Sequence, residues 1–569
     1  MKILLTAVNA KYIHTCPAVY SLKAFAGKHG NGKTQIGIAE YTINDRYQEV
    51  LSGILSHHAD VIAFSVYIWN RDYICRLIRD IRKICGQDVL IWAGGPEPTY
   101  DPETFLFREK ADLCMLGEGE ETFTRLSDLL SEGKPVRYPP DLPGIAFQSS
   151  PSRERKHDGT DSAPGDLSHT EVGAETLVCT GMAPPVALDS IPFLYEDLSV
   201  FENRILYYEA SRGCPFGCAY CLSGKERGLR HRDVGTVKQE LSFFLREKVK
   251  QVKFIDRTFN ADPAFAAKIW RFLQENDNGV TNFHFEIEAD RMTEELLELV
   301  SSFRPGLIQM EIGVQSANPD TLRSVNRNPD LGRIRKVMDT LVKKQNINLH
   351  LDLIAGLPHE GIDSFRKSFQ AVYSMRPHQF QLGFLKLLRG TALWDHREEY
   401  GLVCSEDAPY EVLKTKWLSY EELHLLHEIS DRLEEFVNTQ GFRRSLCLAE
   451  ELFPDSFSLF ENLVCFFRAS GYDRVHLSVQ RRYEVFAEFI QKQAEQRKDY
   501  PEEKLRLILE TIRFDRMLHT HPPRRMILQE TFDFGEGDVT ICFDHRSCSP
   551  VNGEALFSVI PTTKNGNVL

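Results

Sequence analysis

The stretch Ser211-Arg212-Gly213-Cys214-Pro215-Phe216-Gly217-Cys218-Ala219-Tyr220-Cys221 brings three cysteines together in the order C-x3-C-x2-C. Three thiolates at this spacing can hold three irons of a cubane 4Fe–4S cluster, and they leave the fourth iron without a protein ligand. An open coordination position is what a catalytic metal site offers to its substrate. The spacing therefore predicts a catalytic iron–sulfur cluster held by Cys214, Cys218 and Cys221.

Other uses of these cysteines fit the sequence less well. A structural zinc site needs a fourth ligand, usually from a second cysteine pair. A disulfide scaffold is not expected in a chain of 569 residues with 13 cysteines. The first eight residues are predicted to form a buried strand and not a signal peptide. No apolar run in the sequence approaches the ~20 residues that span a bilayer. We therefore expect a cytoplasmic protein in a reducing compartment, with no membrane partner.

The composition is that of an ordinary globular protein, with 42% hydrophobic and 26% charged residues. A chain of this length is expected to form several domains. The formal net charge of -13 argues against a general nucleic-acid binder, because such proteins carry a basic excess. Nucleic acid is therefore not expected as a partner.

Residues 1–135 alternate short apolar runs with amphipathic helical stretches. Apolar strands separated by helices indicate an α/β fold with a doubly wound, Rossmann-like parallel sheet that is covered on both faces. Such sheets bind ligands at the carboxyl ends of their strands. The expected strands are Lys2–Ala7, Gln35–Tyr41, Val61–Val66, Val89–Ala93 and Leu113–Leu116.

Glycines and polar residues follow three of these strands. Ser65-Val66-Tyr67 closes the third strand, Gly94-Gly95-Pro96-Glu97-Pro98-Thr99 follows the fourth, and Gly117-Glu118-Gly119-Glu120 follows the fifth. Glycine lets the backbone approach a bulky ligand closely. Because glycine turns end many such strands, the pattern alone leaves the ligand open.

Residues 136–198 interrupt the alternation. The run from Gln148 to Gly159 is polar and poor in apolar residues, which is typical of a flexible linker. We expect a linker between two folded domains here.

Residues 199–395 again alternate strand and helix, and six βα units predict a partial (β/α)6 barrel of the TIM type. The cysteine loop follows the first strand of this barrel. Active sites of such barrels lie at the carboxyl ends of the strands. The expected strands are Leu206–Ala210, Gln251–Asp256, His284–Glu288, Leu307–Ile312, Leu349–Ile354 and Phe380–Leu385.

The order of these features resembles the cobalamin-binding class of radical S-adenosylmethionine (SAM) proteins, over roughly residues 1–395. The resemblance implies three cofactors. They are a 4Fe–4S cluster, SAM, whose amino and carboxylate groups chelate the open iron, and cobalamin at the carboxyl edge of the first sheet. The residues implied in cobalamin binding are Asn9, Ser65, Tyr67, Gly94, Gly95, Pro96, Thr99, Gly117, Glu118 and Gly119.

The same resemblance implies which barrel residues surround SAM. Tyr220 would pack near the adenine, and a carboxylate such as Asp256 suits the methionine ammonium, although Asp256 and Asn260 also suit helix capping. Glu286 and Glu288 share one face of a strand, which leaves a paired general acid and base open. The residues implied in SAM binding are Tyr220, Asp256, Arg257, Thr258, Glu288, Gln315, Ser316, Ile354 and Leu357.

A histidine ligand to cobalt is not expected. The motif Asp-x-His-x-x-Gly, whose histidine ligates cobalt in many other B12 proteins, is absent. Asn9-Ala10-Lys11-Tyr12-Ile13-His14 follows the first strand, and the spacing of His14 is wrong for that role. We expect a polar loop residue at the lower face of cobalt. The alternative is a purely structural sheet with no cofactor.

Residues 396–569 are predicted to form a mainly α-helical domain. Apolar residues recur at helical spacing over Tyr420–Asn438, a stripe that faces a core. A small hairpin is expected over Asp533–Phe543. The segment resembles an uncharacterised C-terminal domain of some cobalamin-class proteins, and the sequence does not reveal its role.

The resemblance implies an enzyme, and the expected reaction is methyl transfer to an unactivated carbon. Such a carbon has neither an acidic proton nor a lone pair, so polar methylation fails. A 5′-deoxyadenosyl radical can abstract its hydrogen, and methylcobalamin can supply the methyl group, while the protein positions the reactants. The implied partners are a small-molecule or peptide substrate and an external electron donor of the flavodoxin or ferredoxin type.

Three alternatives stay open at this point. The same cofactors can serve a cyclisation, a rearrangement or a reduction. Methylthiolation is disfavoured because the leading domain lacks a three-cysteine motif. A non-catalytic cobalamin or redox sensor is the third alternative, and no DNA-reading helix or basic tail supports it.

Overall fold

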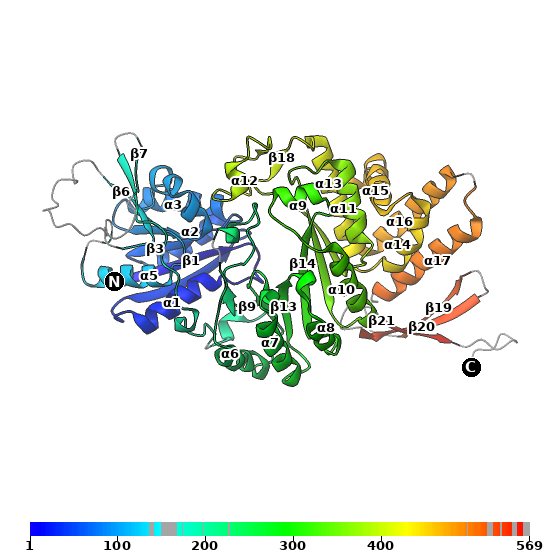
Figure 1. Ribbon diagram of the computed structural model, residues 1–569, viewed down its shortest axis with the longest axis horizontal. Coiled ribbons are helices and arrows are strands. Elements are labelled where there is room, and N and C mark those ends of the chain that lie inside the picture. The colour runs from blue at the N-terminus through cyan, green and yellow to red at the C-terminus, as the bar shows by residue number, and fades with distance from the viewer. Residues whose placement is uncertain are drawn as a thin grey trace.

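The computed structural model describes residues 1–560 except 135, 137–141, 150–167, 173–174, 196, 226–227, 498, 521–526, 535–537 and 549–554. A sheet domain at the N-terminus, a barrel domain and a helical domain follow one another along the long axis of the molecule (Figure 1). In this described part of the chain, no helix is long and apolar enough to cross a membrane.

The N-terminal domain is built on a sheet of strand order β2-β1-β3-β4-β5-β6-β8-β7. Its first five strands are parallel, and helices cover both faces, α1 and α5 on one and α2 and α3 on the other. The predicted doubly wound sheet is therefore confirmed. The strands are β1 (Lys2–Asn9), β2 (Gln35–Thr42), β3 (Val61–Ser65), β4 (Leu90–Gly94) and β5 (Leu113–Met115). The helices are α1 (Pro17–His29), α2 (Tyr47–Ser56), α3 (Arg71–Cys85), α4 (Pro96–Tyr100) and α5 (Glu120–Ser131).

The segment that composition suggested as a linker contributes three more strands to this sheet. β6 (Ile145–Ser149), β8 (Glu175–Cys179) and β7 (Ser168–Val172) pair in antiparallel fashion beyond β5. The apolar start of β6 is buried against the sheet, which explains why it pairs although polar sequence follows it. Residues 150–167, which include most of the polar run, lie outside the described residues.

The central domain is a six-stranded parallel sheet of order β16-β15-β14-β13-β12-β9 with β9 and β16 at its edges. This is the predicted partial barrel. Burial alternates along the strands, because apolar residues face the outer helices and polar residues face the concave side. The strands are β9 (Leu206–Tyr208), β12 (Gln251–Phe254), β13 (Asn282–Ile287), β14 (Ile308–Gln315), β15 (Asn348–Ala355) and β16 (Gln379–Phe384). The outer helices are α6 (Val234–Arg246), α7 (Pro263–Glu275), α8 (Glu294–Ser301), α10 (Leu331–Lys344) and α11 (Ile362–Tyr373).

The C-terminal domain is mainly helical, as predicted, and its apolar core is continuous with that of the barrel. Ser419 and Glu422 form a capping box that begins α13, and the apolar stripe of this helix is buried. β19 and β20 pair in antiparallel fashion across the range of the predicted hairpin, and β21 adds a third antiparallel strand. The helices are α13 (Tyr420–Leu433), α14 (Arg443–Ala449), α15 (Ser456–Ser470), α16 (Val479–Gln496) and α17 (Glu502–His519). The strands are β19 (Ile527–Asp533), β20 (Asp538–Cys548) and β21 (Ala555–Ile560).

Replacing a core residue of α13 tests whether the helical domain is part of the same folded unit. Leu426 has none of its surface exposed, so Leu426→Ala should lower the free energy of unfolding by about 2–5 kcal/mol. Leu413, which is 39% exposed in the same domain, is the matched control. Leu413→Ala should change the free energy of unfolding by about 0.5 kcal/mol or less. Urea unfolding followed by circular dichroism measures both. Equal effects of the two changes would contradict this packing.

Candidate functional site

A cavity of about 400 Å³ lies between the carboxyl edge of the N-terminal sheet and the mouth of the barrel. Nine of the ten residues that the sequence implied in cobalamin binding line it. They are Ser65, Tyr67, Gly94, Gly95, Pro96, Thr99, Gly117, Glu118 and Gly119. The barrel contributes Glu209, Arg212, Gly213, Ile255 and Arg257 to the same wall. One space is therefore shared by the ligand edge of the first domain and the active-site end of the second.

Asn9 is the exception among these residues. Its side-chain amide donates to Glu40 Oε1 at 3.0 Å and to the carbonyl of His14 at 3.2 Å, and it does not line the cavity. Asn9 therefore shapes the loop after β1. His14 in that loop points to the barrel, where its Nδ1 lies 2.6 Å from the hydroxyl of Tyr207.

The glycines of the cavity wall are required by the backbone. Gly95 has a φ of +110°, and a Cβ there would lie 2.5 Å from the carbonyl oxygen of Val66. Gly117 has a φ of +82°. Both conformations favour glycine. The chain can therefore pass close beneath the cavity without side chains that would fill it, as a large planar ligand requires.

The cysteine loop lies directly beside this cavity. Its ends are fixed by short pairing of β10 (Ser211–Arg212) with β11 (Arg230–His231), and its centre by a hydrogen bond from the Ala219 amide to the Val325 carbonyl at 3.0 Å. Burial raises the pKa of the Cys214 and Cys218 thiols. Among the described residues no three His, Cys, Asp or Glu side chains converge on one metal ion. A cubane cluster does not require three side chains around one metal ion, because each cysteine ligates a different iron.

Arg327 is a residue of this site that the sequence analysis missed. Its Nη1 lies 3.9 Å from Cys218 Sγ and 3.4 Å from the Tyr220 hydroxyl. Its Nη2 donates to Glu288 Oε1 at 2.7 Å and to the Gly313 carbonyl at 2.6 Å. Arg327 follows the short helix α9 (Pro319–Ser324) in a loop with no motif, so only the fold brings it to the cysteines. A guanidinium at this point can bind a carboxylate.

Asp256 is fully enclosed beneath the cysteine loop. It accepts hydrogen bonds from the Ser211 hydroxyl at 2.5 Å and the Ala210 amide at 3.0 Å, and burial raises its pKa to about 7. It therefore supports the strand end that leads into the cysteines. Neither Asp256 nor Asn260 caps a helix, because Asp262 caps α7 and Asn260 exchanges hydrogen bonds with the backbone of Glu288.

The other residues implied in SAM binding differ in where the structure places them. Arg257 lines the cavity. Gln315 ends β14 with a φ of +70°, a strained conformation of the kind found at functional sites. Ser316 and Leu357 are fully buried, and Ser316 donates to Glu360 Oε1 at 2.8 Å. The last two therefore support the strand ends, while Ile354, Thr258 and Glu288 lie at the carboxyl ends of their strands.

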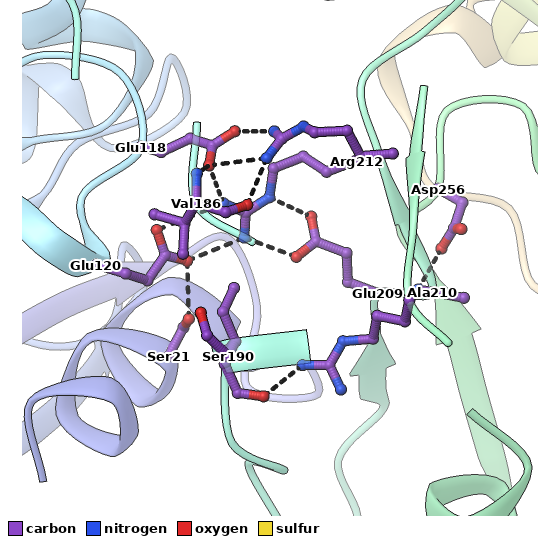
Figure 2. A network of polar contacts seen from close by, with 12 residues as sticks. Ser21, Glu118, Glu120, Val186, Ser190, Glu209, Ala210, Arg212 and Asp256 are labelled. Carbon is purple, nitrogen blue, oxygen red and sulfur yellow. Dashed lines mark hydrogen bonds and ion pairs between the residues drawn. The ribbon is translucent and has the colours of Figure 1, made fainter. Parts of the chain in front are cut away.

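Arg212 joins the two domains at the cavity. It pairs with Glu118 at 3.0 Å and Glu120 at 2.9 Å on the N-terminal domain, and with Glu209 at 2.7 Å on the barrel. The carboxylates converge on it from both sides (Figure 2). Burial alone would raise the pKa of Glu120, but the Arg212 guanidinium outweighs this effect and holds that pKa below its ordinary value. Glu118 also binds Arg230 and accepts from the Val186 amide at 2.8 Å, so its carboxylate belongs to this junction.

A second junction lies on the far side of the cavity wall. Arg71 of α3 pairs with Glu97 at 2.8 Å and Asp101 at 2.6 Å. Tyr410, from the segment after the barrel, donates to Glu97 at 2.7 Å, and Arg389 pairs with Asp101 at 3.1 Å. The loop that carries Gly94 and Gly95 is therefore held to the barrel as well.

Comparisons with known protein families agree with this arrangement. Residues 3–127 match the B12 binding domain, residues 208–372 match the radical SAM superfamily, and residues 398–533 match a protein family of unknown function, DUF4080. The chain thus combines the two domains that define the cobalamin-binding radical SAM proteins. A C-terminal domain of the DUF4080 family follows them.

Two curated relatives are methyltransferases by name. The chain is 26% identical over 353 residues to the 2-(S-pantetheinyl)-carbapenam-3-carboxylate methyltransferase of Streptantibioticus cattleyicolor, which covers 59% of this chain and 47% of that protein. It is 25% identical over 367 residues to the cobalamin-dependent radical SAM methyltransferase TokK of Streptomyces tokunonensis. That alignment covers 59% of this chain and 48% of TokK. The chain thus spans about half the length of these relatives.

Two solved structures share the fold. The cobalamin-dependent SAM radical enzyme OxsB with aqua-cobalamin bound aligns with a TM-score of 0.59 at 16% identity, over 90% of this chain and 84% of that one. The radical SAM methyltransferase TsrM of Kitasatospora setae, with cobalamin and a [4Fe-4S] cluster bound, aligns with a TM-score of 0.55 at 15% identity, over 72% and 76%. The likeness extends over both cofactor domains and into the C-terminal part.

Removing the Arg212 guanidinium tests the domain junction. Arg212→Met leaves Glu118, Glu120 and Glu209 without this cation, and breaking a buried ion pair in this way costs about 3–5 kcal/mol. The free energy of unfolding, measured by urea titration with tryptophan fluorescence, should fall by an amount of that order. Arg271 pairs with Glu295 at an exposed site, and Arg271→Met should cost about 1 kcal/mol or less. Similar losses in both variants would contradict the junction.

Proposed function

We propose that this protein is a cobalamin-dependent radical SAM enzyme that methylates an unactivated carbon of a small molecule or peptide. The observation that carries the proposal is the single cavity between the strand ends of the B12 binding domain and the mouth of the radical SAM barrel. When bound, the cluster and SAM supply a 5′-deoxyadenosyl radical, and cobalamin supplies the methyl group. These two chemistries need one shared space, because the methyl group must reach the carbon from which hydrogen was taken.

The chain's own residues would bind, orient and enclose the reactants. We assign the cluster to Cys214, Cys218 and Cys221. We assign the carboxylate of SAM to Arg327, whose guanidinium also contacts Tyr220 and Glu288. The residues that complete the proposed SAM site are Arg257, Thr258, Gln315 and Ile354, with Asp256, Ser316 and Leu357 as their support.

Cobalamin would lie on the glycine-lined edge of the first sheet. The wall there carries Gly95 and Gly117 in left-handed conformations and the half-buried ring of Tyr67. His14 is hydrogen-bonded to Tyr207, which favours a cobalt lower face without a histidine ligand. We propose Tyr67 and Ser65 as the polar groups of that wall.

An external electron donor of the flavodoxin or ferredoxin type would reduce the cluster, since no second cluster motif is present in the sequence. The cytoplasm is the proposed location, because a cluster of low potential requires a reducing compartment. A cyclisation, rearrangement or reduction with the same cofactors is the competing outcome of the assay below.

Reconstituted, anaerobically purified protein tests this function directly. With reductant and SAM carrying a labelled methyl group, it should bind iron and cobalamin, form 5′-deoxyadenosine and label its cobalamin. Cys214→Ala should abolish 5′-deoxyadenosine, whereas Cys465→Ala, at an exposed free cysteine, should leave it unchanged. 5′-Deoxyadenosine without bound cobalamin would reduce the first domain to a structural role. An altered product without labelled methyl would favour the competing reactions.

Replacing Arg327 tests the proposed SAM carboxylate site. A hydrogen-bonded charge pair contributes about 1.5–3 kcal/mol, so Arg327→Met should weaken SAM binding by about 10- to 100-fold. The shift of the reduced cluster's electron paramagnetic resonance spectrum during SAM titration reports this affinity. Arg323, four positions earlier and largely exposed, is the control. Wild-type affinity in the Arg327 variant would remove it from the SAM site.

A further inference from the structure

The concave face of the barrel sheet carries an unusual set of ionisable side chains. Barrel interiors are ordinarily filled with bulky apolar residues, and placing charged groups there costs free energy unless they are paired. Here strands β12 to β15 direct six ionisable groups to one side, while their apolar neighbours pack against the outer helices. The six residues are Lys253, His284, Glu286, Glu311, His350 and Asp352.

Five of these groups lie within ion-pair distance of one another. Glu311 Oε2 lies 3.0 Å from His284 Nε2 and 3.2 Å from Lys253 Nζ. Burial alone would raise the pKa of Glu311, but the hydrogen bond with His284 and the charge of Lys253 lower that pKa to about 2. His350 Nε2 lies 2.9 Å from Asp352 Oδ1. These two groups of partners account for every charge on the concave face except one.

Glu286 is the one of the six ionisable residues without such a partner among the described residues. It makes no hydrogen bond or ion pair with any residue that the structure describes, although it lies between the two sets of partners. Burial, followed by the repulsion of Glu311, raises its pKa to about 7. Arg257 and Lys253 act on it only through their charges, so removing the carboxylate breaks no hydrogen bond or ion pair among the described residues. Its oxygens are left to accept a hydrogen bond from a partner outside the chain.

The position of Glu286 relates it to both the cavity and the proposed SAM site. It precedes Glu288 by two residues on the same face of β13, a distance of about 7 Å along a strand. Glu288 is bonded to Arg327 beside the cysteines. On the other side, Lys253 pairs in register with Tyr207 of β9, and Tyr207 lines the cavity. Arg257, whose charge acts on Glu286, also lines the cavity, so the concave face borders the space between the two cofactor domains.

We propose that the concave face binds the substrate of this enzyme through a basic nitrogen, with Glu286 as the residue that accepts its N–H. The inference rests on the proposed function and narrows its substrate class. Lys253 already pairs with Glu311, and Arg257, the other cation whose charge acts on Glu286, makes no ion pair with it. A basic nitrogen of the substrate would supply the missing partner, whereas an anionic group would meet the carboxylates of Glu286, Glu311 and Asp352.

A binding experiment without turnover tests this recognition. Saturation-transfer NMR on the full-length protein compares n-butylamine with butyrate, and the tripeptide Gly-Lys-Gly with its Nε-acetylated form. Butylamine should give signals that Glu286→Gln reduces by about tenfold, the effect expected for a lost charge-assisted hydrogen bond, and butyrate should give none that depend on Glu286. Glu298 on α8 is exposed, and Glu298→Gln is the matched control that should change nothing.

The outcomes separate two sources of the nitrogen and two kinds of failure. Glu286-dependent binding of butylamine alone indicates a small amine, whereas additional binding of Gly-Lys-Gly but not of its acetylated form indicates a basic peptide side chain. Equal amine signals in wild type and Glu286→Gln, or Glu286-dependent binding of butyrate, would overturn the inference. Because no turnover is needed, a protein that forms no 5′-deoxyadenosine would contradict the proposed function and still give this answer.

Two further measurements exclude a merely structural role. Glu286→Gln removes a group without partners, so its melting temperature should equal or exceed that of the wild type, and a large decrease would count against the inference. Glu286→Asp keeps the charge on a shorter side chain and should retain part of the amine signal. Loss of the signal in Glu286→Asp as complete as in Glu286→Gln, with an unchanged fold, would contradict recognition by charge.

Discussion

The ion pairs of Arg212 are the constraint on which the arrangement of this molecule depends. The residue stands two positions before Cys214, and it binds carboxylates of both cofactor domains. Because Glu118 and Glu120 follow β5, the same arginine fixes the distance between the glycine-lined edge and the cysteine loop. A shift of either domain would leave buried charges unpaired, which costs several kcal/mol. The cavity keeps its shape for this reason.

Strand polarity makes such a junction necessary. The first five strands of the N-terminal sheet and all six barrel strands are parallel, and such strands bind ligands at their carboxyl ends. Two cofactors can therefore meet only if these two edges face each other, and polar loop edges offer little apolar surface for packing. Charge pairing takes that role here. Arg71 and Tyr410 bind Glu97 and so join the two domains by polar contacts at a second point.

The sequence predicted the parts of the site that depend on local pattern. The cysteine spacing, the strand ends with their glycines and the alternation of the barrel strands are all readable in one dimension. Arg327 was missed because it reaches Cys218 from a loop more than a hundred residues away, and no short-range signal marks it. Leu357 and Ser316 lie at the right strand ends but face inward, since a turn decides which way a side chain points. The three strands of 145–179 pair beyond β5 across a polar run, which composition cannot reveal.

The charged concave face is a different case, because burial alternates along Ile308–Gln315 and Asn348–Ala355 and the sequence analysis did not use this alternation. The apolar residues at every second position pack against helices, and the polar residues between them have no such packing role. A closed barrel would have had to bury Glu311, His350 and Asp352 without water or ligand. An open sheet with β9 and β16 at its edges avoids that cost. The incomplete barrel and its ionisable interior are thus one feature, since a charged interior is stable only where a polar molecule can enter.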